Sequence, residues 1–218
     1  NHTQLNKGSK YMFKKLTYAL LTLVFIPLAF GWVSAPVHAS VEIGKPAPDF
    51  TATDIHGNEF NLADHKGKIV VLEWTNHLCP FVVKQYSTHN MQNTQKTATD
   101  NGVVWVSIVS SAPGKQGYVT PEEAAQIEKD VDAHATTRIL DPTGEIGKLY
   151  AAKTTPHMFV ISAQGTVEYN GAIDDKPSPR PESVEGAHNL VLAALDALST
   201  GRNVDVPLTA PYGCSVKY

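Results

Sequence analysis

Two cysteines, Cys79 and Cys214, are the residues in this 218-residue sequence whose side chains could do redox or nucleophilic chemistry. They stand far apart, which fits neither the close spacing of a zinc finger nor the number of cysteines in a disulfide framework. A thiolate is the form that acts as nucleophile or metal ligand, so the setting of each cysteine decides its chemistry.

The residues around Cys79 predict a reactive thiol. A run of apolar residues at 69–72 indicates a buried strand, and Pro80 suits the first position of a helix. A cysteine at this turn would lie near unpaired backbone N–H groups and the positive end of the helix dipole, which both favour a thiolate. The alternative is a small, buried and unreactive side chain, which is common for free cysteine.

Cys214 lies in a C-terminal tail, residues 202–218, that has no helical or strand periodicity. We expect this tail to move and to reach Cys79. A sulfenic acid or mixed disulfide at Cys79 needs a second thiol to release its product, and Cys214 is the one available. The alternatives for Cys214 are a structural disulfide and an unpaired thiol.

Several titratable residues are expected near Cys79. Glu73 interrupts an apolar strand, where a half-buried carboxylate could accept or return a proton, or could instead tilt to solvent. His77 and His157 are candidates for a general base. Our main hypothesis includes no metal and no cofactor, but Cys79, His77 and His157 could form a soft copper or zinc site. Lys84 is expected on the surface of the helix.

The elements that must position these residues alternate between strands and helices, which is typical of an α/β fold. We predict a hairpin over 50–61, strands at 69–72, 103–109, 138–140, 157–161 and 166–169, and helices at 81–100, 121–133, 146–151 and 187–198. This order indicates a mixed central sheet with helices packed on it.

The N-terminal region has the pattern of a secretory signal peptide. Residues 12–39 have a basic start, an apolar middle and an ending with small side chains at Val37 and Ala39, and residues 1–11 precede them. Pro27 interrupts the apolar stretch, which leaves it short of the ~20 residues of a membrane span. We therefore predict a periplasmic or secreted protein that starts at Ser40 after cleavage and resides in an oxidising compartment.

The mature chain is expected to be one domain, residues 40–201, followed by the tail 202–218. A formal net charge of −3, with 18 lysine and arginine residues, provides no basic footprint for nucleic acid. We expect no nucleic-acid partner, and no membrane association after removal of the signal peptide.

Four segments together resemble the thioredoxin superfamily, in its redoxin branch related to alkyl hydroperoxide reductase and thiol-specific antioxidant proteins. They are the opening 44–50, the strand segment 67–74, the turn Cys79-Pro80-Phe81-Val82, and Thr155-Pro156, where the superfamily carries a cis-proline. The resemblance spans about residues 43–200. It implies a thioredoxin-like three-layer sandwich with a mixed central sheet, and a substrate site bordered by Pro80, Thr155 and Pro156.

The sequence departs from that resemblance at two places. Val82 stands where many relatives have the second cysteine of a Cys-x-x-Cys motif, so no disulfide can form within the turn. Peroxidase relatives usually place a threonine three residues before the reactive cysteine and recruit an arginine. Here Asn76 occupies that place, Thr75 precedes it, and Arg138 is the candidate arginine.

The sequence therefore predicts an exported thiol oxidoreductase. Cys79 would attack a disulfide sulfur or a peroxide oxygen, and Cys214 would resolve the product. The partners would be a thiol or disulfide protein or a small-molecule peroxide, together with an external electron donor. Two alternatives stay open, a copper- or heme-assembly carrier and a non-catalytic thioredoxin-fold binding module.

Overall fold

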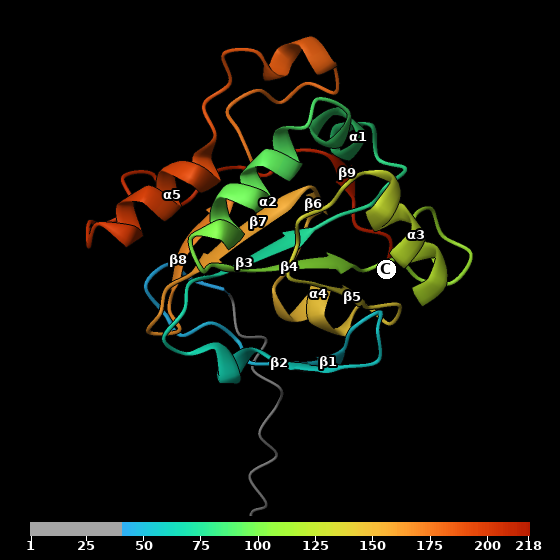
Figure 1. Cartoon of the computed structure of the whole chain (residues 1–218), viewed down its shortest axis with the longest axis horizontal. Helices are drawn as coiled ribbons and strands as arrows, with labels where there is room; N and C mark the ends of the chain where they lie inside the picture. The colour runs from blue at the N-terminus through green and yellow to red at the C-terminus, as the bar shows by residue number, and fades with distance from the viewer. Residues whose placement is uncertain (1–40) are drawn as a thin grey trace, which may run out of the picture. The chain divides into compact units, whose positions relative to one another are not determined.

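A five-stranded mixed sheet forms the centre of the protein (Figure 1). The computed structural model describes residues 41–218, so the predicted signal peptide at 1–39 lies outside the described residues. The strand order is β5-β4-β3-β7-β8. These strands are β3 (Val70–Trp74), β4 (Val104–Val109), β5 (Thr137–Leu140), β7 (His157–Ile161) and β8 (Val167–Gly171). β3 pairs in parallel with β4 and antiparallel with β7, so the predicted mixed sheet is confirmed.

Both faces of the sheet are covered, because β3 and β4 are apolar on both sides. Val71 and Trp105 pack on one face, and Leu72 and Trp74 pack on the other. The first face carries α1 (Pro80–Ser87), α2 (Asn90–Asp100) and α5 (Leu190–Ser199), and the second carries α4 (Glu145–Leu149) and the hairpin β1 (Thr51–Thr53) and β2 (Glu59–Asn61). The three-layer sandwich predicted from the sequence is therefore present.

The remaining helix, α3 (Pro121–Asp130), begins as the sequence predicts. Thr120 and Glu123 form a reciprocal capping box before it. Ala124 of α3 is buried in a small cluster with Ile55 and Val119, against which Leu140 of β5 packs. Within residues 41–218, no helix has the length and apolar character needed to span a membrane.

The single helix predicted over 81–100 is wrong, because two helices occupy this segment. His89 adopts a left-handed conformation, with φ of 59°, between α1 and α2. The Thr88 hydroxyl donates to the carbonyl oxygen of Lys84 at 2.8 Å and so satisfies a carbonyl at the end of α1. The break separates two helices that both pack on the first face of the sheet.

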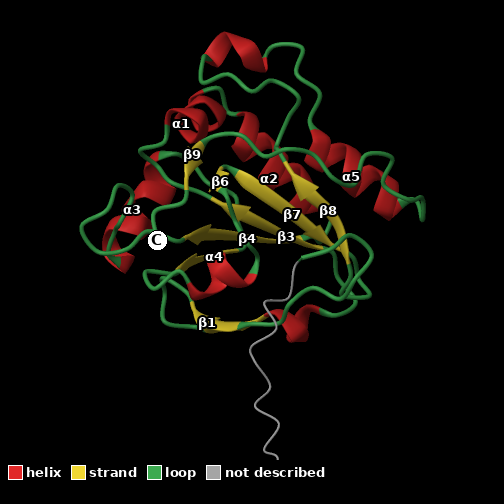
Figure 2. Cartoon of the chain, turned by 180° about the vertical axis from the view of Figure 1, so that it is seen from behind, coloured by secondary structure: helices red, strands yellow, loops and turns green. Residues whose placement is uncertain are grey.

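The C-terminal tail, which has no periodicity in the sequence, contains a short strand. Residues Cys214–Ser215 form β9, which pairs antiparallel with β6 (Thr154–Thr155), and the two strands lie side by side in Figure 2. The pairing continues where the Val216 amide donates to the Lys153 carbonyl oxygen, and the Ala112 amide donates to that of Lys217. The tail thus pairs with the strand that precedes β7.

Candidate active site

Cys79 lies at the junction between β3 and α1, where the sequence placed it. It is the N-cap residue of α1, and Pro80 occupies the first helical position. The Cys79 amide donates to the Asn76 carbonyl oxygen at 2.9 Å, which closes the turn, and the Val82 and Val83 amides donate to the Cys79 carbonyl oxygen. The Cys79 side chain is fully buried, at 0% exposure.

Cys214 lies directly against Cys79, and their sulfur atoms are 2.8 Å apart. The register of β6 and β9 explains this contact, because Cys214 pairs with Thr155 across the two strands. The Thr155-Pro156 peptide bond is cis, as the resemblance implies. The Cys79 thiol also contacts the Thr155 carbonyl oxygen, at 3.1 Å. The fold therefore brings Cys79, Cys214, Thr155 and Pro156 into one site.

The two thiols have opposite electrostatic settings. Burial works to raise the pKa of Cys79, but hydrogen bonding, with Cys214 first, outweighs it and lowers that pKa. Burial, together with the hydrogen bond and the charge of Cys79, raises the pKa of Cys214 to about 11. A single proton shared by the pair would therefore reside on Cys214, with Cys79 as the thiolate.

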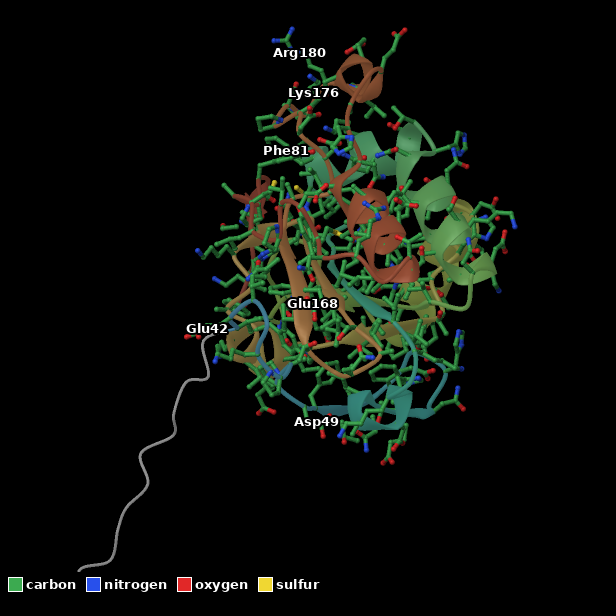
Figure 3. The ribbon with its side chains drawn as sticks, turned by 90° about the vertical axis from the view of Figure 1, so that its left-hand side faces the viewer. Glu42, Asp49, Phe81, Glu168, Lys176 and Arg180 are labelled. Carbon is green, nitrogen blue, oxygen red and sulfur yellow. The ribbon has the colours of Figure 1, made fainter. Side chains whose placement is uncertain are left out.

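A buried polar cluster anchors the tail two residues before Cys214. The Tyr212 hydroxyl donates to Asp174 and accepts from the Lys84 ammonium at 3.2 Å. Lys84 has only 1% exposure, lies 3.5 Å from Asp174 and donates to the Lys176 carbonyl oxygen, so its predicted surface position is wrong. The Tyr212 ring packs against Phe81, which lies below Lys176 in Figure 3.

Glu73 is more deeply buried than the sequence suggested, with 0% exposure instead of a half-buried position. Its carboxylate accepts hydrogen bonds from four side chains: Tyr86 at 2.9 Å, Gln95 at 2.9 Å, Trp105 at 2.8 Å and Ser107 at 3.2 Å. These donors come from α1, α2 and β4. Glu73 therefore joins both helices to the sheet beneath the site.

Among the residues that the structure describes, Asn76 and Thr75 do not contact the sulfur atoms through their side chains in any hydrogen bond. The Asn76 side chain accepts from the Leu78 amide at 2.9 Å and donates to the Gln116 carbonyl oxygen at 3.2 Å, so it shapes the turn and holds a neighbouring loop. Thr75 lines a cavity of about 370 Å³ with His77 and Arg138. Arg138 is 3.1 Å from Glu128, with which it forms an ion pair.

The histidines proposed as alternative metal ligands do not gather at the sulfur atoms. His157 is buried, where its Nδ1 accepts from the Lys153 amide at 3.2 Å and its Nε2 lies 2.8 Å from the Asn170 amide oxygen. Burial lowers the pKa of His157 to about 4. His77 lines the cavity with Arg138. Within the described part of the chain, no group of three or more His, Cys, Asp or Glu residues is placed to hold a metal ion.

Sequence reasoning missed the residues that fix the tail, Lys84, Asp174, Tyr212 and Gly213. A partial signal was available, since an aromatic residue and a glycine directly precede Cys214. Lys84 and Asp174 carried no such signal, because each gains its role from partners far away in the sequence.

The fold and this site define a class: a thioredoxin-fold protein with a cysteine at the strand-to-helix turn, in contact with the residue that precedes a cis-proline. The AhpC/TSA family model matches residues 43–170, more than half of the chain. The protein belongs to the AhpC/TSA family.

The comparisons with individual proteins agree with this family. The chain is 26% identical over 164 residues to the thiol-disulfide oxidoreductase ResA of Bacillus cereus, covering 70% of this chain and 85% of that protein. It is also 26% identical over 128 residues to ResA of Geobacillus kaustophilus, covering 53% and 73% of the two chains.

Two solved structures resemble the protein over most of its length. An uncharacterized conserved protein from Geobacillus kaustophilus has a TM-score of 0.68 and 28% identity, covering 83% of this chain and 94% of that one. A hypothetical protein from Sinorhizobium meliloti has a TM-score of 0.69 and 25% identity, covering 82% and 96%. The sheet and helices around Cys79 are thus an arrangement that other proteins share.

Proposed function

We propose that this protein is an exported thiol–disulfide oxidoreductase whose redox centre is the pair Cys79 and Cys214. The observation that carries the proposal is the 2.8 Å separation of their sulfur atoms. The similarity to two ResA proteins named as thiol-disulfide oxidoreductases supports the reaction class. Val82 removes the usual partner within the turn, and β9 brings Cys214 to the same sulfur from the other end of the chain.

The reaction is a two-electron exchange. When Cys79 and Cys214 join in a disulfide, two protons leave them, and a disulfide substrate is reduced to two thiols. The reverse reaction regenerates both protein thiols at the expense of an external thiol donor. The substrates are thus thiol or disulfide compounds, among which thiol and disulfide proteins are the class that the relatives' names suggest.

Peroxide reduction stays a prediction from the sequence. Its candidate residues have other partners, because Arg138 pairs with Glu128 and the Asn76 side chain closes the turn. The copper- or heme-assembly alternative would use Cys79 with His77 or His157. The ring nitrogens of His157 already have partners in Lys153 and Asn170, and His77 lines the cavity with Arg138. Disulfide exchange requires only that the two cysteine sulfur atoms lie in contact, as they do here.

A redox titration tests the proposal. The protein is equilibrated with mixtures of reduced and oxidised dithiothreitol, and its free thiols are counted after acid quenching. Both thiols should disappear together, in one two-electron transition, and a peptide joining Cys79 to Cys214 should appear in mass spectrometry. Cys79→Ser and Cys214→Ser should each abolish the transition. The absence of the joined peptide under oxidising conditions would refute the proposal.

Export is a separate part of the proposal, based on the signal-peptide pattern of residues 12–39. N-terminal sequencing of the protein recovered from the periplasm or the medium should begin at Ser40. Retention of Met12 in all of the protein would overturn export and the oxidising environment that it implies.

A further inference from the structure

The two cysteine residues of the redox pair differ in their exposure to solvent. Cys79 has 0% exposure, whereas Cys214 is partly exposed. Val82 of α1 packs in the same buried cluster as Cys79, and the Thr155 carbonyl oxygen contacts its thiol. A thiol from outside the protein therefore has no direct path to Cys79 in this arrangement.

The strand β9 closes the side of the site next to the cis-proline. In a thioredoxin fold this edge could pair with an extended substrate, but here β6 already pairs with Cys214–Ser215 of the same chain. The backbones of Gly213 and Thr155 lie so close together that a β-carbon at Gly213 would be 2.0 Å from the Thr155 carbonyl oxygen. The protein's own chain thus occupies the place from which a peptide would reach Cys79.

The tail is held on both sides of Cys214, so uncovering Cys79 would break several buried contacts. On one side, Tyr212 bonds to Asp174 and Lys84. On the other side, the Tyr218 hydroxyl donates to the Ala152 carbonyl oxygen at 3.0 Å, and its ring lies so close to Gly147 that a β-carbon there would be 2.5 Å from it. Exchange with the tail in place avoids this cost.

We propose that exchange with external thiols and disulfides enters through Cys214, and that Cys79 is the leaving and resolving sulfur. This reverses the roles that the sequence suggested, and it rests on the proposed function. An external thiolate attacks the Cys214 sulfur of the oxidised protein. A bond forms between the external sulfur and Cys214, the Cys79–Cys214 bond breaks, and Cys79 leaves with the electron pair as a thiolate.

A second external thiolate completes the reaction. It attacks the external sulfur of the mixed disulfide, which releases a disulfide of the two external groups and leaves Cys214 as a thiolate that takes up a proton. The protein gains two electrons, and the external thiols lose two. In the opposite direction, Cys214 loses its proton and attacks a sulfur of the external disulfide, which expels one external thiolate. Cys79 then attacks the Cys214 sulfur of the mixed disulfide and expels the second external thiolate.

The electrostatic setting fits these roles. A thiol with a lower pKa leaves faster in disulfide exchange, and the hydrogen bonds around Cys79 lower its pKa. The pKa of Cys214 is raised to about 11, so this sulfur holds the proton once the protein is reduced. The more exposed cysteine is thus also the poorer leaving group, which directs attack toward its sulfur.

Trapping the mixed disulfide tests the proposal. Oxidised wild-type protein is mixed with excess glutathione, quenched in acid within seconds, and treated with N-ethylmaleimide. The proposal predicts glutathione on Cys214 and maleimide on Cys79 of the same molecules. Glutathione on Cys79 with a free Cys214 would overturn it. If oxidation never joins the two cysteines, the proposed function itself fails, so the two failures are distinguishable.

In the wild-type protein the second cysteine can resolve the mixed disulfide before it is trapped. Single-cysteine variants avoid this loss. Reduced Cys79→Ala and Cys214→Ala are exposed to glutathione disulfide, and the glutathionylated fraction is followed by mass spectrometry. The rates are measured across a range of pH and expressed per thiolate, because only the thiolate attacks a disulfide. Per thiolate, Cys214 in the first variant should react at least about tenfold faster than Cys79 in the second, because the tail still covers Cys79. In urea this difference should vanish, and an equal or higher rate per thiolate for Cys79 in the folded proteins would contradict the proposal.

Discussion

The backbone of Gly213 lies against the carbonyl oxygen of Thr155, so closely that a β-carbon at position 213 would be 2.0 Å from that oxygen. Gly213 also has a φ of 145°, which side chains rarely adopt. The adjacent residue, Cys214, is the strand partner of Thr155. The contact between the two sulfur atoms thus depends on the absence of a side chain one position earlier.

Gly213→Ala should weaken the redox pair without removing either thiol. The new methyl group would push β9 away from β6, and Cys214 would lose its position at Cys79. We expect the equilibrium constant for the Cys79–Cys214 disulfide, measured against dithiothreitol, to fall at least about tenfold, or ~1.4 kcal/mol.

Gly201→Ala is the matched control, because Gly201 also has a positive φ, of 69°, but has open space around it. It should cost folding stability and leave the disulfide equilibrium unchanged. An equal shift in both variants would show that the close approach at Thr155 is not what positions Cys214.

Tyr212→Phe should loosen the tail while keeping its aromatic packing. The substitution keeps the ring against Phe81 but removes the hydroxyl that bonds to Asp174 and Lys84. Leaving buried polar groups without a partner costs about 1–3 kcal/mol. Urea unfolding should report that loss, and hydrogen exchange at the Val216 amide, which bonds to the Lys153 carbonyl oxygen, should accelerate.

The partly exposed side chain of Tyr118, at 42%, offers a control for this change. Tyr118→Phe should leave both the unfolding free energy and the exchange at Val216 near the wild-type values. Wild-type protection of Val216 in Tyr212→Phe would mean that the hydroxyl does not anchor the tail.

His157 should make the protein less stable in mild acid. Its pKa is lowered to about 4 in the folded state, chiefly by burial, against an ordinary value of 6.5. Between these values the unfolded chain binds the proton and the folded protein does not, so stability is present above about pH 6.5 and falls as the pH drops toward 4. The full shift corresponds to about 3 kcal/mol.

The measurement is urea unfolding at several pH values from 4 to 7, for wild type and His157→Gln. The glutamine amide can still donate toward Asn170, but it cannot titrate in this range. The variant should be less stable at pH 7 and show a shallower decline toward pH 4. An unchanged pH dependence would assign the acid sensitivity to other groups.

The local parts of the site were predictable from the sequence. The apolar run before Cys79 and the proline after it specify a strand, a turn and a helix start through interactions between near neighbours. The cis peptide bond before Pro156 followed from the family resemblance and is present. These features depend on backbone propensity and burial, which a short segment of sequence carries.

The arrangement of the tail was not predictable in the same way. A strand of two residues, β9, has no periodicity to detect, and its partner β6 lies about 60 residues earlier. Lys84 looked like a surface residue because lysine is rarely buried without a partner, and its partners Asp174 and Tyr212 meet it only through the fold. Nonlocal pairing thus determines which of the two cysteines is buried and which is partly exposed.

Glu73→Gln should separate a structural role of this carboxylate from a role in proton transfer. The four groups around it act as donors, and burial together with the charge of Glu73 raises the pKa of Tyr86, so that hydroxyl keeps its proton. A glutamine side chain would place an amide N–H₂ against at least one donor. The resulting loss of stability should be about 1–3 kcal/mol in urea unfolding.

A structural role predicts that the rate of glutathione-driven reduction of the Cys79–Cys214 disulfide, measured well below the unfolding transition, stays within about twofold of wild type. Its donors, among them Tyr86 and Trp105, belong to the helix and sheet framework. Glu59→Gln, at an exposed position on β2, is the control and should change neither quantity. If Glu73→Gln slows the reduction severalfold and alters its pH profile while Glu59→Gln does not, Glu73 takes part in proton transfer and the structural assignment is wrong.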